Sequence, residues 1–223
     1  MDTRREKTEL RTVDVAVLAK APLAGQAKTR LAALLGPHGA ARAHRQMVLR
    51  ALCTVRQAGM VPQLWCTPST DHRFFSALRR TQALACWTQV QGDIGARMHA
   101  AFAEQALRSA RPMLLIGTDC PVLDANHLRE VARRLLAGDE AVFTPAEDGG
   151  YVLVGLRRPT PALFERIDWG GEQVMSQTLN RLTQLGLRHS QMPTLWDVDR
   201  PADWLRWQTL QSACGQRDQP NRA

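Results

Sequence analysis

The segment VDVAVLAKAPLAGQAKTRLAALLG, residues 13–36, sets the pattern for the rest of the chain. Its first seven residues are an apolar, β-branched run that predicts a buried strand. A loop with one proline and one glycine follows. The residues from Lys28 onward then predict a helix that ends near Gly36 and Pro37. Strand, loop and helix in this order begin a βαβ unit, so the segment predicts an α/β fold.

Apolar runs and amphipathic segments alternate along the remaining sequence in the same way. Further strands are predicted at 61–67, 84–90, 112–117, 140–146, 151–156 and near 189–198. Helices are predicted at 39–59, 71–80, 94–109, 123–138, near 172–186 and at 201–210. Two successive strands around EDGGY interrupt the alternation, which predicts a mixed sheet and an inserted site there. The fold class expected is a single α/β domain, a three-layer sandwich with a mostly parallel, mixed central sheet.

The chain of 223 residues is long enough for one large domain with a sizeable core. We predict an N-terminal extension over residues 1–12, one domain over 13–211 and a polar tail over 212–223. The sequence contains no internal repeat and no linker.

The composition limits the kinds of molecule that the protein is expected to bind. The formal net charge is +8, with three lysines and with twenty-six arginines that are dispersed along the chain. Dispersed arginines are typical of solvated helix faces, and no nucleic-acid recognition motif accompanies them, so no nucleic-acid partner is expected. Apolar runs are strand-sized, so no membrane span is expected. Five cysteines without a C-x-x-C spacing favour a reducing cytoplasm without disulfides or a zinc site. The six histidines show no metal-ligand spacing and are expected at the surface.

The loop after the first predicted strand carries scarce lysines. Lys20 and Lys28 lie there together with Gly25 and Arg30. Glycine permits close backbone approach, the helix start presents free N–H groups, and the cations suit phosphate. The loop lacks both G-x-x-x-x-G-K-[ST] and G-x-G-x-x-G, which disfavours a Walker ATPase or an NAD-binding domain. An ordinary basic turn that caps a helix is the alternative interpretation.

Carboxylates follow two of the later predicted strands. Asp119 in GTDCP lies directly after the most apolar strand, and Asp197 and Asp199 lie in WDVDRPADW. Such hard oxygen ligands suit Mg²⁺, which takes one or two carboxylates plus phosphate oxygens. A turn-forming Asp119 and simple helix-start charge for the later pair are the alternatives. Asp203 is expected to cap the final helix.

Two glycine-containing loops complete the set. QGDIGARM places Gly92, Asp93 and Gly95 before a helix, where backbone groups could surround a base or a ribose. AEDGGY places Gly149 and Gly150 between two strands. The double glycine predicts either a simple hairpin or room for a bulky substrate.

Five motifs taken in order, AKAPLAGQAKTRL, QGDIGARM, GTDCP, EDGGYVLVGL and DVDRPADW, resemble an uncharacterised bacterial transferase family. That family is akin to 2-phospholactate guanylyltransferase and to the molybdenum-cofactor guanylyltransferase, and its members are often labelled glycosyltransferase-like. It belongs to the nucleotide-diphospho-sugar transferase (GT-A) superfamily. The resemblance extends from about residue 13 to 207 and implies a GT-A, Rossmann-like form of the sandwich.

The resemblance also implies roles for individual residues. The nucleotide-binding set is Ala19, Lys20, Lys28, Arg30, Gly92, Asp93, Gly95 and Arg97, of which the first four lie at the phosphates and the rest at base and ribose. The metal set for Mg²⁺ or Mn²⁺ is Asp119 with Asp199, and Asp197 in reserve. Asp148, Gly149 and Gly150 border the acceptor pocket, and the catalytic set is Lys28, Arg30 and Asp119. One departure is WGGEQV at 169–174, where related sequences often carry a Trp-Ser-Thr-like segment.

These roles imply nucleotidyl transfer from a nucleoside triphosphate to a small phosphorylated or carboxylate acceptor, with release of pyrophosphate. Glycosyl transfer from a nucleotide sugar is the alternative, although the single aspartate of TDC disfavours it because such enzymes commonly carry D-x-D. A non-catalytic nucleotide-binding protein is a third interpretation, and a nucleic-acid binder is the least favoured.

Overall fold

A computed structural model describes residues 8–217 of the chain. The strands are β1 (Asp14–Lys20), β2 (Pro62–Thr67), β3 (Ala85–Thr88), β4 (Met113–Ile116), β5 (Ala141–Pro145), β6 (Tyr151–Leu156) and β7 (His189–Gln191). The helices are η1 (Thr29–Leu31), α2 (Ala32–Gln57), α3 (Arg73–Gln82), α4 (Ile94–Ala106), α5 (Ala125–Ala137), η2 (Pro161–Leu163), α6 (Val174–Gln184) and α7 (Pro201–Arg217). Residues 1–7 of the predicted extension and 218–223 of the predicted tail lie outside the described part.

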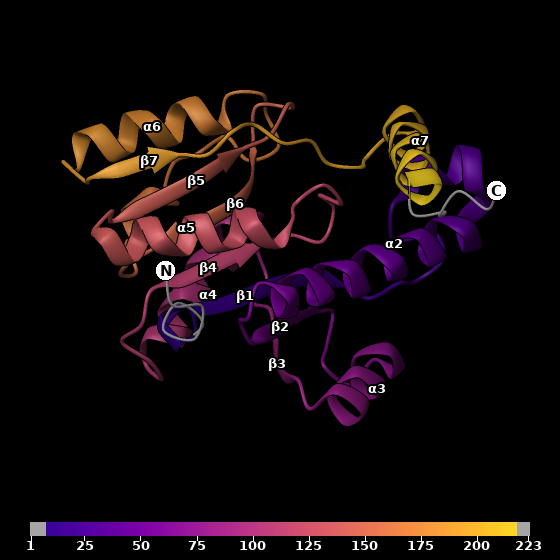
Figure 1. Cartoon of the computed structure of the whole chain (residues 1–223), viewed down its shortest axis with the longest axis horizontal. Helices are drawn as coiled ribbons and strands as arrows, with labels where there is room; N and C mark the ends of the chain where they lie inside the picture. Colours follow the sequence, from indigo (N-terminus) through magenta and orange to yellow (C-terminus); the bar gives the residue numbers. More distant parts are fainter. Residues whose placement is uncertain (1–7, 218–223) are drawn as a thin grey trace.

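The strands form one sheet in the order β3-β2-β1-β4-β6-β5-β7 (Figure 1). Neighbours pair in parallel except for β6, which runs antiparallel to both β4 and β5. The predicted mixed, mostly parallel sheet is therefore confirmed. The antiparallel strand enters through the hairpin at residues 146–150, where the EDGG turn reverses the chain.

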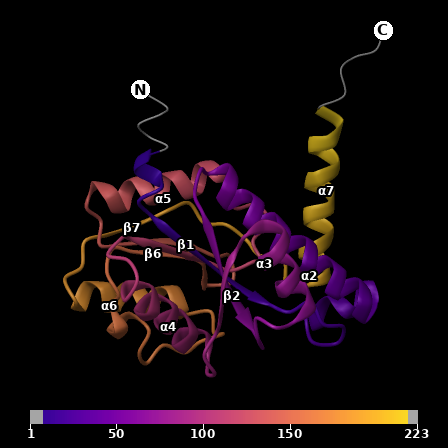
Figure 2. The same cartoon turned by 90° about the horizontal axis from the view of Figure 1, so that it is seen from below.

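Alternating side chains of the strands divide the core into two layers. Val15 and Val17 of β1 pack with α2, α3 and α5, whereas Ala16 and Leu18 pack with α4 and α6. Figure 2 shows α2 and α5 on one side of the sheet and α4 and α6 on the other. Successive side chains of a strand thus enter opposite layers of the core. Helices cover both faces of the sheet, which makes the fold a three-layer sandwich.

Helix α7 stands apart from these layers (Figures 1 and 2). Its first turns bury Trp204 and Trp207 against η1 and the start of α2, and Trp196 joins them. These late tryptophans are therefore core residues. In the part of the chain that the structure describes, no helix is both long and apolar enough to cross a membrane.

Several predicted boundaries differ from the structure. The strand expected near 189–198 ends at Gln191, because Pro193 lacks the N–H that a ladder needs, and only Leu195 returns to pair with Ala146. The two helices expected around Gly36 are joined into α2 through a kink, where Gly36 has φ +67°. The last helix runs to Arg217 rather than 210.

Three local features show how the ends of the helices and of β1 are held. Asp124 caps α5 by accepting the His127 amide at 2.8 Å. Gly59 follows α2 with φ +83°, as a residue just after a helix end commonly does. Leu10 of the predicted extension is 2% exposed and belongs to the same core layer as β1.

Candidate functional site

A cavity of about 300 Å³ opens at the carboxyl ends of β1, β2 and β4, where a parallel α/β sheet binds its ligands. Five residues predicted from the sequence line it, namely Ala19, Lys20, Arg97, Asp119 and Asp197. Its walls also contain apolar side chains of β4, β6 and α4. The cavity therefore combines an apolar interior with charged groups on one side, as small-molecule sites do.

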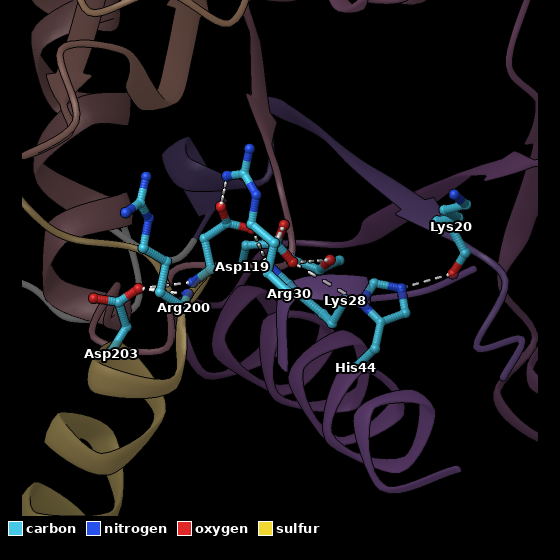
Figure 3. A network of polar contacts seen from close by, with 9 residues as sticks. Lys20, Lys28, Arg30, His44, Asp119, Arg200 and Asp203 are labelled. Carbon is cyan, nitrogen blue, oxygen red and sulfur yellow. Dashed lines mark hydrogen bonds and ion pairs between the residues drawn. The ribbon is translucent and has the colours of Figure 1, made fainter. Parts of the chain in front are cut away.

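Lys28 joins the predicted carboxylates at this edge of the sheet (Figure 3). Its Nζ lies 2.9 Å from Oδ2 of Asp119 and 3.8 Å from Oδ1 of Asp199, and only 6% of its side chain is exposed. The backbone of Lys28 has φ +49°, an uncommon left-handed conformation for a residue with a side chain. One ammonium thus lies between two carboxylates that are eighty positions apart in the sequence.

Arg30 extends the same network to the surface. Its guanidinium forms an ion pair with the carboxylate of Asp199. Asp203 accepts the amides of Asp199 and Arg200 at 3.1 and 2.7 Å, which confirms its expected role at the start of α7. The Val198 amide donates to the Asp119 carbonyl at 2.8 Å. These backbone contacts fix Asp199 relative to the loop after β4.

His44 of α2 is buried beside this network, so its expected place at the surface is wrong. Its Nε2 donates to the Lys20 carbonyl at 2.8 Å, and its Nδ1 lies 3.9 Å from Oδ1 of Asp119. Burial lowers the pKa of His44, and the Asp119 carboxylate partly opposes that shift. The neutral ring therefore holds the end of β1 and contacts the carboxylate side of the cavity.

Asp197 lies on the cavity wall among like charges. Burial, followed by the nearby Asp148 carboxylate, raises the pKa of Asp197 to about 6, while Lys28 opposes the shift. Asp148 itself accepts the Gly150 amide at 2.9 Å in the hairpin turn. The structure thus brings the predicted acceptor loop near Asp197.

The QGDIGARM loop divides into two parts. Arg97 lines the cavity, and its buried Nε has no hydrogen-bond partner among the described residues. Gly92, Asp93 and Gly95 do not line it. Asp93 caps α4 by accepting the Ala96 amide at 2.8 Å, and a Cβ on Gly95 would lie 2.2 Å from Nε1 of Trp169. In this structure those residues shape the helix start behind the cavity.

Gly149 marks a close backbone approach. It has φ +86°, and a Cβ there would lie 1.9 Å from the carbonyl oxygen of Glu172. Its own carbonyl accepts the Met175 amide at 2.8 Å. The double glycine therefore lets the WGGEQV segment pack against the hairpin, and neither Gly149 nor Gly150 lines the cavity.

Sequence reasoning missed three cavity residues. Gln89 is 7% exposed and donates its amide to the carbonyls of Trp65 at 2.7 Å and Ala19 at 3.4 Å. Tyr151 has a buried hydroxyl without a partner in the described structure, and burial raises its pKa. His44 is the third. A polar residue at the end of a strand is the one sequence signal that could have identified Gln89.

The arrangement of the carboxylates indicates whether they could hold a divalent cation. Among residues 8–217, no three His, Cys, Asp or Glu side chains cluster closely enough to hold a metal. Asp119 and Asp199 nevertheless both face the Lys28 ammonium, so they already surround one positive charge. Where phosphate oxygens of a substrate complete the coordination of Mg²⁺, the protein supplies only one or two carboxylates, and this pair fits that requirement.

The chain is similar to proteins of known structure. A protein from Desulfovibrio desulfuricans G20, described as a "putative nucleotide-diphospho-sugar transferase", superimposes with a TM-score of 0.77 at 25% identity, over 85% of this chain and 83% of that one. No curated protein matches the chain.

Two more distant solved structures share the fold. The 4-diphosphocytidyl-2C-methyl-D-erythritol synthase of Anaerococcus prevotii DSM 20548 has a TM-score of 0.60 at 9% identity, over 92% and 99% of the two chains. CMP:2-keto-3-deoxy-manno-octonic acid synthetase complexed with CTP has 0.58 at 13%, over 90% and 98%. Together with the Desulfovibrio structure, they confirm the predicted nucleotide-diphospho-sugar transferase fold.

A family model described as "Uncharacterized protein conserved in bacteria (DUF2064)" matches residues 49–171, more than half of the chain. Its boundaries enclose β2 through the hairpin and the WGG segment, and so include Asp119 and the double glycine. The chain belongs to the DUF2064 family.

Proposed function

We propose that this chain is a nucleotidyltransferase that depends on Mg²⁺ or Mn²⁺. It transfers a nucleotidyl group from a nucleoside triphosphate to a small phosphorylated or carboxylate acceptor and releases pyrophosphate. The observation that carries the proposal is the network of Lys28, Arg30, Asp119 and Asp199, which joins the cavity through Asp119. The fold shared with a synthetase complexed with CTP supports it.

The proposed reaction needs positioning and charge stabilisation more than covalent catalysis. An acceptor oxygen attacks the α-phosphorus, and the bond from that phosphorus to the oxygen bridging it to the β-phosphorus breaks. Pyrophosphate leaves with the electron pair. Lys28 and Arg30 stabilise the charge on the departing group, because cations aimed at developing negative charge lower the barrier. A phosphate or carboxylate acceptor is already ionised, so no general base is required.

Asp119 and Asp199 would hold the metal ion, with Asp197 on the adjacent wall. When bound, that ion supplies charge neutralisation for the phosphates. Lys28 is suited to share these carboxylates, because an ammonium on a flexible stem can follow a phosphate group as the ligand binds. Gln89 and Arg97, deeper in the cavity, would contact the base or ribose.

The first experiment is a thermal-shift panel in Mg²⁺ that compares each nucleoside triphosphate with common nucleotide sugars. A ligand at 100 times its Kd adds about 2.7 kcal/mol to the free energy of unfolding, which raises Tm by several degrees in a chain of this size. Preference for one triphosphate supports the proposal. Pyrophosphate release with that triphosphate and candidate acceptors then measures turnover. A shift without turnover would favour a non-catalytic nucleotide-binding protein.

Glycosyl transfer is the second candidate, favoured by the similarity to the Desulfovibrio protein. The same edge of the sheet would then hold a nucleotide sugar, and the bond broken would be that between the sugar C1 and the phosphate oxygen. A thermal shift with a nucleotide sugar alone, followed by release of a nucleoside diphosphate rather than pyrophosphate, would replace the nucleotidyl proposal with this one.

A further inference from the structure

A second hollow of about 610 Å³ is lined in part by the loop that follows β1. That loop, α2 and the start of α3 enclose it, and we call it the arginine groove. Arg42 and Arg45 come from α2, and Arg73 comes from the first turn of α3. His38 and His72 lie at its rim, and no Asp or Glu of the described chain lines it.

The three guanidinium groups have no partner that would neutralise them. None of Arg42, Arg45 and Arg73 forms an ion pair or a hydrogen bond within residues 8–217. Arg45 instead lies over the ring of Phe74, 5.8 Å from its centroid. Both Arg45 and Phe74 line the groove, and the unpaired charges give it a positive potential.

The rest of the groove is apolar. Pro22 and Leu23 of the loop, together with Ala41, Phe74 and Ala77, form its walls. His72 accepts the Phe74 amide on Nδ1 at 3.3 Å, so its neutral ring carries the proton on Nε2 and can donate it to a ligand. Forked donors beside apolar walls suit a ligand with both a phosphate and an apolar or planar part.

We propose that the arginine groove is a second ligand site, distinct from the cavity, for a small molecule that carries a phosphate group next to an apolar or planar portion. Arg42, Arg45 and Arg73 bind the phosphate, and the Leu23 and Phe74 side of the groove contacts the apolar portion. Exposed dispersed arginines ordinarily point into solvent, whereas these three converge from two helices on one hollow.

The groove and the cavity share one loop. The Leu23 carbonyl accepts the amides of Gln26 and Ala27 at 3.1 and 2.9 Å, and Lys28 follows directly. A ligand against Leu23 therefore contacts the segment that positions Lys28 between its carboxylates. This coupling to the cavity rests on the proposed function, whereas the binding site itself does not.

Isothermal titration of the full chain with phenyl phosphate and with inorganic phosphate tests the site. We expect phenyl phosphate to bind more tightly, and the R42A/R45A/R73A variant to bind it at least about tenfold more weakly, because each lost charged contact is worth more than an ordinary hydrogen bond. The matched control R56A/R79A/R80A removes the same charge from the same two helices outside the groove and should stay within about twofold of the wild type. Circular dichroism verifies that both variants fold.

Four results would overturn the site. They are absence of binding to the wild type, equal weakening in both triple variants, loss of phenyl phosphate binding in Lys28→Ala, and binding of single-stranded DNA in place of phenyl phosphate. Lys28→Ala separates the two proposals, because it removes a residue of the cavity network alone. A chain without turnover that still binds phenyl phosphate in the groove would leave this inference intact.

Discussion

The cavity and the arginine groove are both lined by residues in or next to the loop after β1, share no lining residue, and differ in how their positive charges are paired. Beside the cavity, Lys28 is 6% exposed and lies against Asp119, which lines the cavity, and Asp199. In the groove, Arg42, Arg45 and Arg73 are exposed and have no acidic neighbour in the lining. Paired charges suit a metal ion with a polyphosphate, whereas unpaired charges suit an anion alone. Variants that affect the cavity network and leave the groove unchanged, or the reverse, test this difference.

Asp119→Asn has the largest expected effect. The change removes the carboxylate nearest to Lys28 while it keeps the shape of the side chain. Turnover in Mg²⁺ should fall about 100-fold or more, the scale seen when a charge-stabilising group is removed. Phenyl phosphate binding to the groove should not change. Asp71→Asn, at an exposed loop position, is the control, and retained turnover in Asp119→Asn would remove that residue from the mechanism.

Lys28→Ala should weaken triphosphate binding by about 10- to 100-fold, the range for a charge-assisted hydrogen bond to a phosphate. Binding of the corresponding nucleoside should be almost unchanged, since the ammonium lies on the carboxylate side of the cavity. Titration with both ligands makes the comparison. An equal loss for the nucleoside would refute the phosphate role of Lys28.

Gly149→Ala tests how closely the hairpin beside the cavity is packed. The new Cβ would meet the Glu172 carbonyl, and the backbone is left-handed, so we expect a loss of about 1–3 kcal/mol. Gly170→Ala is the control, because Gly170 has φ +89° but open space around its Cβ, and it should lose only about 1 kcal/mol. Thermal unfolding measures both, and similar Tm values would contradict the packing argument.

Added salt has the smallest expected effect, and it should affect the exposed charges of the groove more than the buried charges beside the cavity. The screening length falls from about 10 Å at 0.1 M to about 3 Å at 1 M, and exposed charges respond most. Added NaCl should weaken phenyl phosphate binding in the groove several-fold. The Tm of the free protein should change little, because the Lys28 ammonium is buried between its partners. Salt-independent binding would place the probe in a shielded site.

The sequence predicted the sheet well because burial leaves a clear pattern. The β-branched run of β1 and the apolar β4 could belong only to buried strands, and the EDGG turn marked the hairpin. The position of β6 between β4 and β5 could not be predicted, because an apolar run has the same composition in parallel and antiparallel pairing. The predicted last strand extended past Pro193, although a proline disfavours a strand there, and β7 ends at Gln191.

The site was predictable where the residue type itself carries the chemistry. Asp119, Asp199 and Lys28 were selected as charged residues after strands, and the structure brings them together. Tyr151 and His44 were missed because a tyrosine in a strand and a histidine in a helix carry no positional signal. The groove was missed because Arg42 and Arg73 are far apart in the sequence. Only the fold, which places α2 beside α3, brings them to one hollow.

The position of Lys28 has one more consequence, for how the protein is made. Two carboxylates at one sheet edge would repel each other while the chain folds, and in many metal sites only the arriving ion relieves that repulsion. Here the side chain of Lys28 supplies a tethered ammonium between the two carboxylates, so Asp119 and Asp199 can come together before any ion is present. The folding of this edge of the sheet would then not depend on a bound ion.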